Sequence, residues 1–158
     1  MKKWFLGILL LMMAMNANAQ FEAGTGYLGV SSTNLGLSYS TNEKVRWGAN
    51  ISGGIFLADK WLAKAELGYN HTRAVDDFTA GLGLRYYFIE NGIFLGAGGE
   101  FAHFTPNRND VMIPVEVGYA FYVNHYITIE PSFFYKMSLD DFSDKSMVGF
   151  KIGLGFYF

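Results

Sequence analysis

Apolar and other residues alternate strictly along the last eleven residues of the chain. Val148, Phe150, Ile152 and every second residue to Phe158 are apolar, whereas the positions between them are glycine, lysine or tyrosine. Successive side chains of a strand point to opposite faces, while helical spacing would scatter these apolar residues around the helix axis. The pattern therefore predicts a β-strand with one apolar face.

The same period of two recurs through most of the chain. The other segments that show it are 78–88, 111–123, a first strand within 27–39, and segments that begin at Trp47, Trp61, Ile93 and Ile127. Short turns alternate with longer polar connections between these segments, which is typical of an up-and-down meander. The sequence therefore predicts eight antiparallel strands in one domain.

Two places disturb the alternation. Residues 31–34 are Ser-Ser-Thr-Asn, which leaves the register of the first strand open. Pro131 lies within the seventh strand, where it removes a backbone donor from the ladder. We expect a β-bulge at this proline, and such a bulge leaves open which way Phe133, Phe134 and Lys136 point.

Residues 1–19 have the pattern of a secretory signal peptide. Lys2 and Lys3 precede the apolar run 4–15, and Ala17-Asn18-Ala19 forms an A-x-A cleavage site. A membrane-anchoring helix is the alternative, but such a helix needs about 20 apolar residues. We expect cleavage between Ala19 and Gln20, so that 20–158 forms the exported domain.

Composition excludes several classes of protein. The chain has 158 residues, of which 51% are hydrophobic, 18% aromatic and only 16% charged, so it is not a disordered chain. It has no cysteine for a disulfide framework or a thiolate metal site, and its formal net charge of −2 offers no basic excess for nucleic acid. No later apolar run approaches 18 residues, so a membrane-spanning form of this chain must be a closed barrel.

The placement of charge favours a membrane barrel over a soluble one. From the second segment onward the apolar faces carry no charged residue. A soluble barrel must solvate its whole exterior, whereas a membrane barrel needs an uncharged exterior and places polar residues in its lumen. The predicted fold is an all-β, eight-stranded antiparallel up-and-down transmembrane β-barrel. The charges on the opposite, inward faces are Lys64, Glu66, Arg85, Glu100, Glu116, Glu130, Lys136 and Lys151.

Aromatic residues and glycines agree with this orientation. Outward aromatic residues such as Trp61 and Phe156 gather near the short turns, and others such as Trp47 and Tyr135 gather near the longer connections, which is typical of two interfacial girdles. Most strand glycines face inward, where we expect them to make room for large side chains in a narrow lumen.

The export signal, the eight alternating segments and the terminal run KIGLGFYF together resemble the small OmpA/OmpX-like outer-membrane β-barrel family of Gram-negative bacteria. The resemblance implies a monomer in the outer membrane, in contact with lipid and lipopolysaccharide, with its short turns in the periplasm. In that family the terminal alternation is the signal that the barrel-assembly machinery recognises. The resemblance assigns this signal to Ile152, Leu154, Phe156 and Phe158.

Three functions follow from this prediction. The first is a structural or surface-interaction role, with a lumen filled by side chains, because eight strands leave little more than that space and the four acidic and four basic inward residues can pair. The second is a porin-like pathway for small solutes through the polar lumen. The third, which some members of the family suggest, is a lipid-modifying enzyme.

Candidate catalytic and metal-binding residues give little support to the third function. None of His71, His103 and His125 has a hydroxyl and a carboxylate at a spacing that would bring a base to its nucleophile. In the last long connection, the aspartates within 140–144 lack the six to eight converging oxygens of a calcium site. We therefore assign no catalytic residue, cofactor or metal.

Overall fold

The computed structural model describes residues 21–32, 47–71, 76–88, 92–104, 108–139 and 146–158. The predicted signal peptide, its cleavage site at Ala19 and Gln20, and the aspartates within 140–144 lie outside these residues. In the part of the chain that is described, no helix has the length and apolar character needed to cross a membrane.

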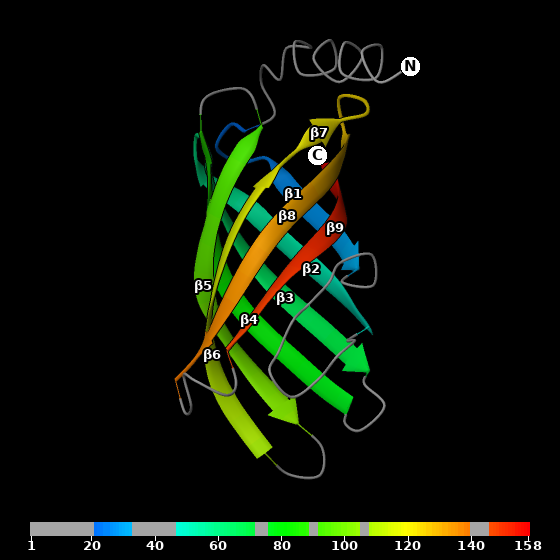
Figure 1. The fold of residues 1–158 in the computed structure, drawn as a ribbon. Helices are drawn as coiled ribbons and strands as arrows, with labels where there is room; N and C mark the ends of the chain where they lie inside the picture. The colour runs from blue at the N-terminus through cyan, green and yellow to red at the C-terminus, as the bar shows by residue number, and fades with distance from the viewer. Residues whose placement is uncertain (1–20, 33–46, 72–75, 89–91, 105–107, 140–145) are drawn as a thin grey trace, which may run out of the picture.

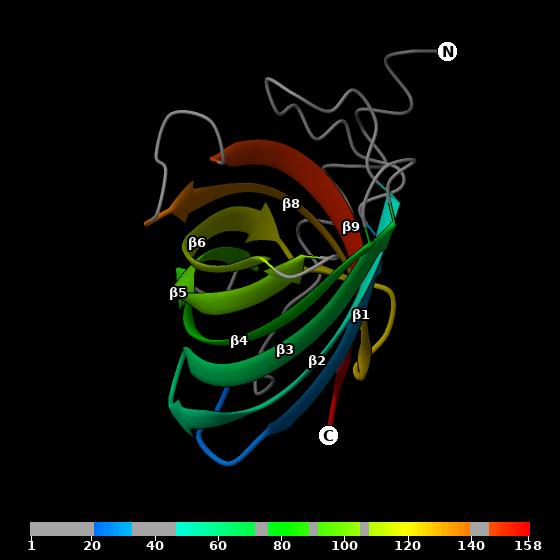
Figure 2. The same ribbon diagram turned by 90° about the horizontal axis from the view of Figure 1, so that it is seen from below.

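The described residues form one closed antiparallel sheet (Figure 1). Its strands are β1 (Gly26–Ser32), β2 (Trp47–Ala58), β3 (Trp61–His71), β4 (Asp76–Phe88), β5 (Ile93–Phe104), β6 (Arg108–Tyr119), β7 (Phe121–Tyr122), β8 (Ile127–Ser138) and β9 (Met147–Tyr157). Strands β1 to β6 pair in chain order, β1 also pairs with β9, and β8 pairs with β9 on one side and with β6 and β7 on the other. These last pairings close the barrel, which Figure 2 shows from one end.

The barrel wall contains eight strand crossings. Strand β7 continues the path of β6 after Ala120, and both pair with β8 in the same register, since Gly118 lies opposite Ser132 and Phe121 lies opposite Ile129. The predicted fold, an eight-stranded antiparallel up-and-down barrel, is therefore confirmed. The predicted segment 111–123 is a single crossing that is interrupted once.

The bulge expected at Pro131 is wrong. Strand β8 keeps a continuous register with β9, in which Pro131 lies opposite Ile152. Pro131, which has no backbone N–H, lies instead where the chain of β6 and β7 is unpaired with β8. That pairing stops at Gly118 and resumes at Phe121. No residue is inserted, because intact pairs on both sides of the proline hold the strands in register.

Side chains after Pro131 therefore keep the alternation of the strand. Phe133 is 62% exposed on the outer face, and Phe134 is buried. Lys136 points inward, where its ammonium group contacts Glu100. The register of β1 is also defined, because Val30 lies opposite Ile51 of β2 and opposite Leu154 of β9.

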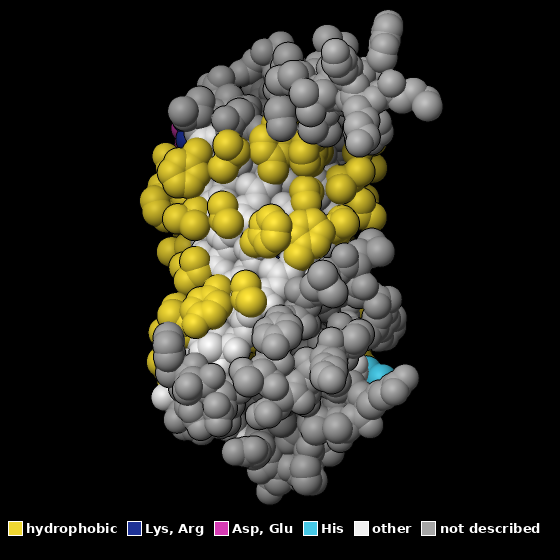
Figure 3. Space-filling model, viewed as in Figure 1, with side chains coloured by type: hydrophobic (Ala, Val, Ile, Leu, Met, Phe, Trp, Pro, Cys, Tyr) yellow, Lys and Arg dark blue, Asp and Glu magenta, His cyan; other side chains and the backbone are white. Residues whose placement is uncertain are grey.

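The outer face of the wall is apolar. Figure 3 shows hydrophobic side chains over the visible part of the described wall, with no acidic or basic side chain among them at mid-height. Leu82, at the middle of β4, is 73% exposed. Near the short turns, Trp61 packs against Tyr86 with ring centroids 4.8 Å apart, and Tyr86 packs against Phe88 at 5.1 Å. Such an exterior suits a hydrocarbon solvent with an interfacial aromatic belt.

The short turns lie at one end of the barrel, together with the C-terminus (Figure 1). Lys60 and Gly92 take positive φ angles of 71° and 85° in two of these turns. At Gly92 a side chain would also come within 2.6 Å of the carbonyl oxygen of Ala120, so this position requires glycine. In the third turn the Asn124 side chain accepts hydrogen bonds from the backbone N–H groups of Tyr126 and Ile127, both at 2.8 Å.

Candidate functional site: the barrel lumen

The interior is filled in layers along the barrel axis. An aromatic cluster lies at the short-turn end, a network of charged side chains lies at mid-height, and a cavity lies toward the end of the long connections. Each layer takes its residues from the inward positions of several strands. Residues far apart in the sequence therefore meet in the lumen.

The aromatic cluster closes the short-turn end. It contains Phe21, Phe56, Tyr87 and Tyr157, with Tyr122 packed against them. The ring of Phe21 stacks on that of Tyr87 with centroids 4.1 Å apart and an interplanar angle of 24°. Phe21 is only 6% exposed although it precedes the first strand.

The backbone around Phe21 is tied to the turn between β2 and β3. The Phe21 carbonyl oxygen accepts a 2.7 Å hydrogen bond from the N–H of Lys60, and the N–H of Ala23 donates to the Asp59 carboxylate at 3.0 Å. The N–H of Gly24 donates to the Phe56 carbonyl at 2.8 Å. These contacts position the segment before β1 across the end of the lumen.

Arg85 is the centre of the charged network. Its Nε and Nη2 atoms donate to Oε1 of Glu116 at 3.0 and 2.9 Å, and its Nη1 atom donates to Oε2 of Glu130 at 2.7 Å. Its guanidinium carbon lies 3.9 Å from the centroid of the Phe94 ring. Arg85 thus links β4 to β6 and β8 across the lumen while one face of the guanidinium packs on an aromatic ring.

Glu130 joins the network to the aromatic cluster. Its carboxylate accepts hydrogen bonds from the hydroxyl groups of Tyr27 at 2.9 Å, Tyr157 at 2.8 Å and Thr128 at 2.9 Å. Together with the bond from Arg85, these contacts satisfy a carboxylate that is only 4% exposed. A buried charge requires such a complete set of partners because desolvation is costly.

Two lysines extend the network on the side away from the aromatic cluster. Glu116 accepts from Lys64 at 2.7 Å and contacts the Lys151 ammonium at 2.8 Å. The same two lysines lie 3.1 and 3.8 Å from Glu66. Glu116 therefore contacts three cationic groups, and the cations and carboxylates alternate around it.

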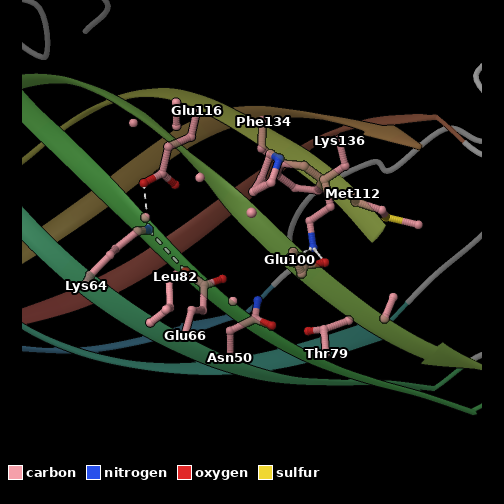
Figure 4. A pocket seen from close by; sticks show the side chains of 18 of the residues that line it. Asn50, Lys64, Glu66, Thr79, Leu82, Glu100, Met112, Glu116, Phe134 and Lys136 are labelled. Atoms are coloured by element: carbon pink, nitrogen blue, oxygen red, sulfur yellow. Dashed lines mark hydrogen bonds and ion pairs between the residues drawn. The ribbon is translucent and has the colours of Figure 1, made fainter. Parts of the chain in front are cut away.

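Lys136 and Glu100 form a separate pair. The Lys136 ammonium donates to both oxygens of Glu100, at 2.6 and 2.7 Å. Lys136 also lies 5.8 Å from the centroid of the Phe134 ring. This pair borders the cavity, in which Figure 4 shows Glu100 and Lys136 pointing toward each other.

The eight charged residues singled out in the sequence all lie in the lumen, and each contacts an opposite charge there. Six belong to the network or its extension, and the other two form the separate pair of Lys136 and Glu100. None of these contacts could be assigned from the sequence. Hydroxyl partners such as Tyr27, Tyr157 and Thr128 were not among the candidate site residues. All three positions point inward in the alternation, and this is the feature of the sequence that could have identified them. Phe21 had no such signal because it precedes the first strand.

Inward glycines have two different roles. At Gly118 a side chain would meet the Phe94 ring at 2.5 Å, and at Gly96 it would meet the Glu116 side chain at 2.6 Å. These glycines make room for lumen side chains, as we predicted. At Gly81 and Gly83 the nearest atoms are backbone carbonyl oxygens of β5, both at 3.0 Å. These two glycines line the cavity instead.

The histidines lie away from the charged network. His103 is exposed, and its Nδ1 atom lies 2.6 Å from the side-chain oxygen of Asn109. His71 is exposed at the end of β3, and His125 is exposed in the turn between β7 and β8. Among the residues that the structure describes, no group of three or more His, Asp or Glu side chains is arranged to hold a metal ion.

The C-terminal apolar residues lie on the outer face of β9. Leu154 and Phe156 are 46% and 36% exposed, and Phe158 is 76% exposed beyond the end of the strand. Phe156 lies opposite Leu28 of β1, and the Phe158 backbone exchanges two hydrogen bonds with Gly26, at 2.6 and 3.0 Å. The last strand therefore closes the barrel against the first.

An apolar exterior around a closed, charge-filled lumen defines the small membrane-spanning β-barrels. The N-terminal β-barrel domain of Pseudomonas aeruginosa OprF is similar, with a TM-score of 0.71 and 17% identity over 86% of this chain and 98% of that domain. Neisserial surface protein A has a TM-score of 0.63 and 11% identity over 85% and 96% of the two chains. The fold is that of the OmpA/OmpX-like outer-membrane barrels, so the resemblance seen in the sequence is confirmed as a likeness of fold.

A third neighbour is Ail, the attachment invasion locus protein of Yersinia pestis, with a TM-score of 0.53 and 15% identity over 87% of this chain and 99% of that one. A de novo designed transmembrane β-barrel is similar at a TM-score of 0.57 and 12% identity, over 87% and 98%. No protein-family model and no curated protein matches the sequence.

Proposed function

We propose that this protein is an integral outer-membrane barrel that does not conduct solutes and has a structural or surface-contact role in the cell envelope. The observation that carries the proposal is the Arg85 network, which crosses the lumen between β4, β6 and β8. On the short-turn side of this network, Phe21 and the aromatic cluster fill the end of the lumen. Eight strands enclose a space that such side chains can fill.

The outer face and the structural neighbours support the location. A lysine or arginine at mid-depth on a lipid-facing surface costs about 2–4 kcal/mol, and none occurs on the outer face of these strands. Two barrels of similar fold, OprG of Pseudomonas aeruginosa and Ail of Yersinia pestis, are outer-membrane proteins. We expect lipid and lipopolysaccharide around a monomeric barrel and export through the signal peptide at 1–19.

Conductance in planar lipid bilayers tests the proposal. The chain without residues 1–19, refolded and reconstituted, should give no stable single-channel steps. A double variant, Phe21→Ala with Arg85→Ala, should conduct because it removes the centre of the network and part of the aromatic cluster. Leu84→Ala, which changes only the outer face, should remain silent. Stable, salt-dependent steps from the unaltered protein would contradict the proposal and favour a small-solute pore.

The exposed alternation at the C-terminus supports a second part of this proposal, that the barrel-assembly machinery recognises Ile152, Leu154, Phe156 and Phe158. Phe158→Ser should lower the amount of barrel in the outer membrane of cells while leaving refolding from urea into detergent unchanged. Val148→Ser, on the same face at the other end of β9, is the matched control. Equal loss in both variants would contradict a specific terminal signal.

A further inference from the structure

The half of the lumen beyond the charged network contains a cavity. About 900 Å³ of empty space, including the part that is open to solvent, lies between the network and the ends of the strands that lead to the long connections. Glu66, Glu116 and Lys64 border it on the network side, and Glu100 and Lys136 border it on the other (Figure 4).

The cavity exists because part of its wall has no side chains. Gly81, Gly83 and Gly98 occupy inward positions of β4 and β5 beside it. Hypothetical side chains at these positions would first meet the backbone of the neighbouring strand, and only at Gly81 does a lumen side-chain atom, Cβ of Glu100 at 3.4 Å, also come near. The space is therefore a property of this glycine-lined wall, whereas elsewhere in the lumen large residues occupy the room that glycines leave.

Three buried polar side chains on the β2, β3 and β4 wall line the cavity without a partner. Asn50, Asn70 and Thr79 are 6%, 9% and 5% exposed. In the part of the chain that the structure describes, none of these side chains forms a hydrogen bond, and their polar atoms keep some exposure to the cavity. Asn50 and Thr79 flank Gly68 on adjacent strands, and a side chain at Gly68 would overlap Oδ1 of Asn50 and Oγ1 of Thr79. Buried polar groups are normally satisfied by protein or by water, so these side chains are available to a partner within the cavity.

The facing wall is apolar and the charges are already neutralised. Met112, Phe134 and Met147 contribute to the lining, and Figure 4 shows Phe134 and Met112 on the opposite side from Asn50 and Thr79. Both oxygens of Glu100 are occupied by Lys136. A charged ligand would have to displace one of these ion pairs, whereas a neutral ligand would not.

We propose that this cavity is a binding site for a neutral, hydroxyl-rich molecule of about the size of a hexose. Hydroxyl groups of such a molecule both donate and accept, which matches two amide side chains and one threonine hydroxyl. Its apolar C–H face would pack on Phe134 and the methionines. A pocket with an apolar surface and a few convergent polar groups is the usual form of a small-molecule site.

Saturation-transfer NMR on the chain without residues 1–19, reconstituted in lipid nanodiscs, tests the proposal. The probes are glucose and N-acetylglucosamine, with glucose 6-phosphate as a charged counterpart and hexanol as an apolar one. The two neutral sugars should give transfer signals and titrate to saturation, and the two counterparts should bind more weakly. The expected preference follows from the neutral charge balance and the unpaired amide and hydroxyl groups.

Variants distinguish the cavity from other surfaces. Thr79→Val and Asn50→Leu should each weaken sugar binding about tenfold, because each removes a hydrogen-bonding group that faces the ligand. Gly68→Val should abolish binding by displacing the Asn50 and Thr79 side chains, whose oxygens its side chain would overlap. Tyr122→Phe is the matched control, because the Tyr122 hydroxyl is also buried without a partner but lies in the aromatic cluster at the other end of the lumen. Heat-modifiable gel mobility establishes that each variant is folded.

Absence of a saturable sugar signal from the folded protein would overturn the proposal and leave water as the partner of the three side chains. Equal binding by the Thr79 and Tyr122 variants, or preferential binding of glucose 6-phosphate, would also overturn it. The proposal is independent of the conductance test: a lumen that conducts and still binds the sugars refutes only the non-conducting role, and a silent lumen that binds neither sugar refutes only the binding site.

Discussion

The half of the lumen near the short turns and the half near the long connections are built by the same strands, yet their polar groups are satisfied differently. In the first half, Glu130 has four hydrogen-bonding partners and Arg85 contacts two carboxylates and an aromatic ring. In the second, Asn50 and Thr79 are buried beside empty space. The satisfied groups near the short turns stabilise the barrel, whereas the buried groups beside the cavity are those that we propose bind a ligand.

The largest effect is expected from Arg85→Met. Removal of one member of a buried ionic group leaves Glu116 and Glu130 without their shared cation, and such losses cost about 3–5 kcal/mol. Denaturant unfolding of the refolded barrel in detergent measures the change. Lys136→Met removes a cation whose one ion pair among the described residues is with Glu100, beside the cavity, and should cost less. Equal losses would contradict the difference between the two halves.

Phe21→Ala should have the next largest effect. Truncation of a buried phenylalanine costs about 3 kcal/mol, and this ring packs on Phe56 and Tyr87 at 5.9 and 4.1 Å. The same unfolding experiment measures the loss. Phe78→Ala, at an outward position that is 52% exposed, is the control and should change stability much less. An unchanged stability of the Phe21 variant would show that the segment before β1 does not contribute to the closed end.

A pair of threonines compares the two halves directly. Thr128 donates to the Glu130 carboxylate at 2.9 Å, so Thr128→Val should cost about 1.5–3 kcal/mol, the usual value for a hydrogen bond to a charged group. Thr79 makes no such bond to any residue that the structure describes, and Thr79→Val should change stability by no more than about 0.5 kcal/mol. Unfolding in the absence of added sugar measures both variants. A large loss at Thr79 would indicate that its hydroxyl has a structural partner.

A pair of glycines gives the smallest expected difference. At Gly118 an added methyl group would meet Phe94 at 2.5 Å and Ser132 at 2.6 Å, so Gly118→Ala should cost about 1–3 kcal/mol by overpacking. At Gly81, beside the cavity, the nearest atom is a carbonyl oxygen at 3.0 Å, and Gly81→Ala should cost less than about 1 kcal/mol. Thermal unfolding followed by gel mobility compares the two. The reverse order would mean that the cavity wall is the more tightly packed region.

Much of the wall could be predicted from the alternation alone. Strands β2, β3, β5 and β8 begin at Trp47, Trp61, Ile93 and Ile127, the residues at which the apolar pattern starts. The prediction failed at Pro131, because a sequence shows the missing donor but not whether neighbouring pairs can hold the register. In the structure the pairing is interrupted between β6 and β7, and the register with β8 is the same on both sides of the interruption.

The candidate site could be predicted less completely. Parity placed Lys64, Glu66 and the other charged residues inside, but it could not show which cation meets which carboxylate. Those contacts depend on the stagger of strands around a closed barrel, which brings Arg85 of β4 to Glu130 of β8, a residue 45 positions away. The role of Phe21 depends on the path of a segment that has no alternation of its own.

The alternation of residues along the chain is enough to predict which face of each strand meets an apolar surrounding and which faces the lumen. A period of two with no charge on one face is sufficient to specify a wall with an apolar exterior and a polar interior, because a strand directs successive side chains to opposite sides. How the interior is filled depends on the folded barrel. Closure of the barrel sets the distances across the lumen. Those distances separate a network in which each charge has a partner from a cavity in which Asn50, Asn70 and Thr79 have no side-chain partner among the described residues.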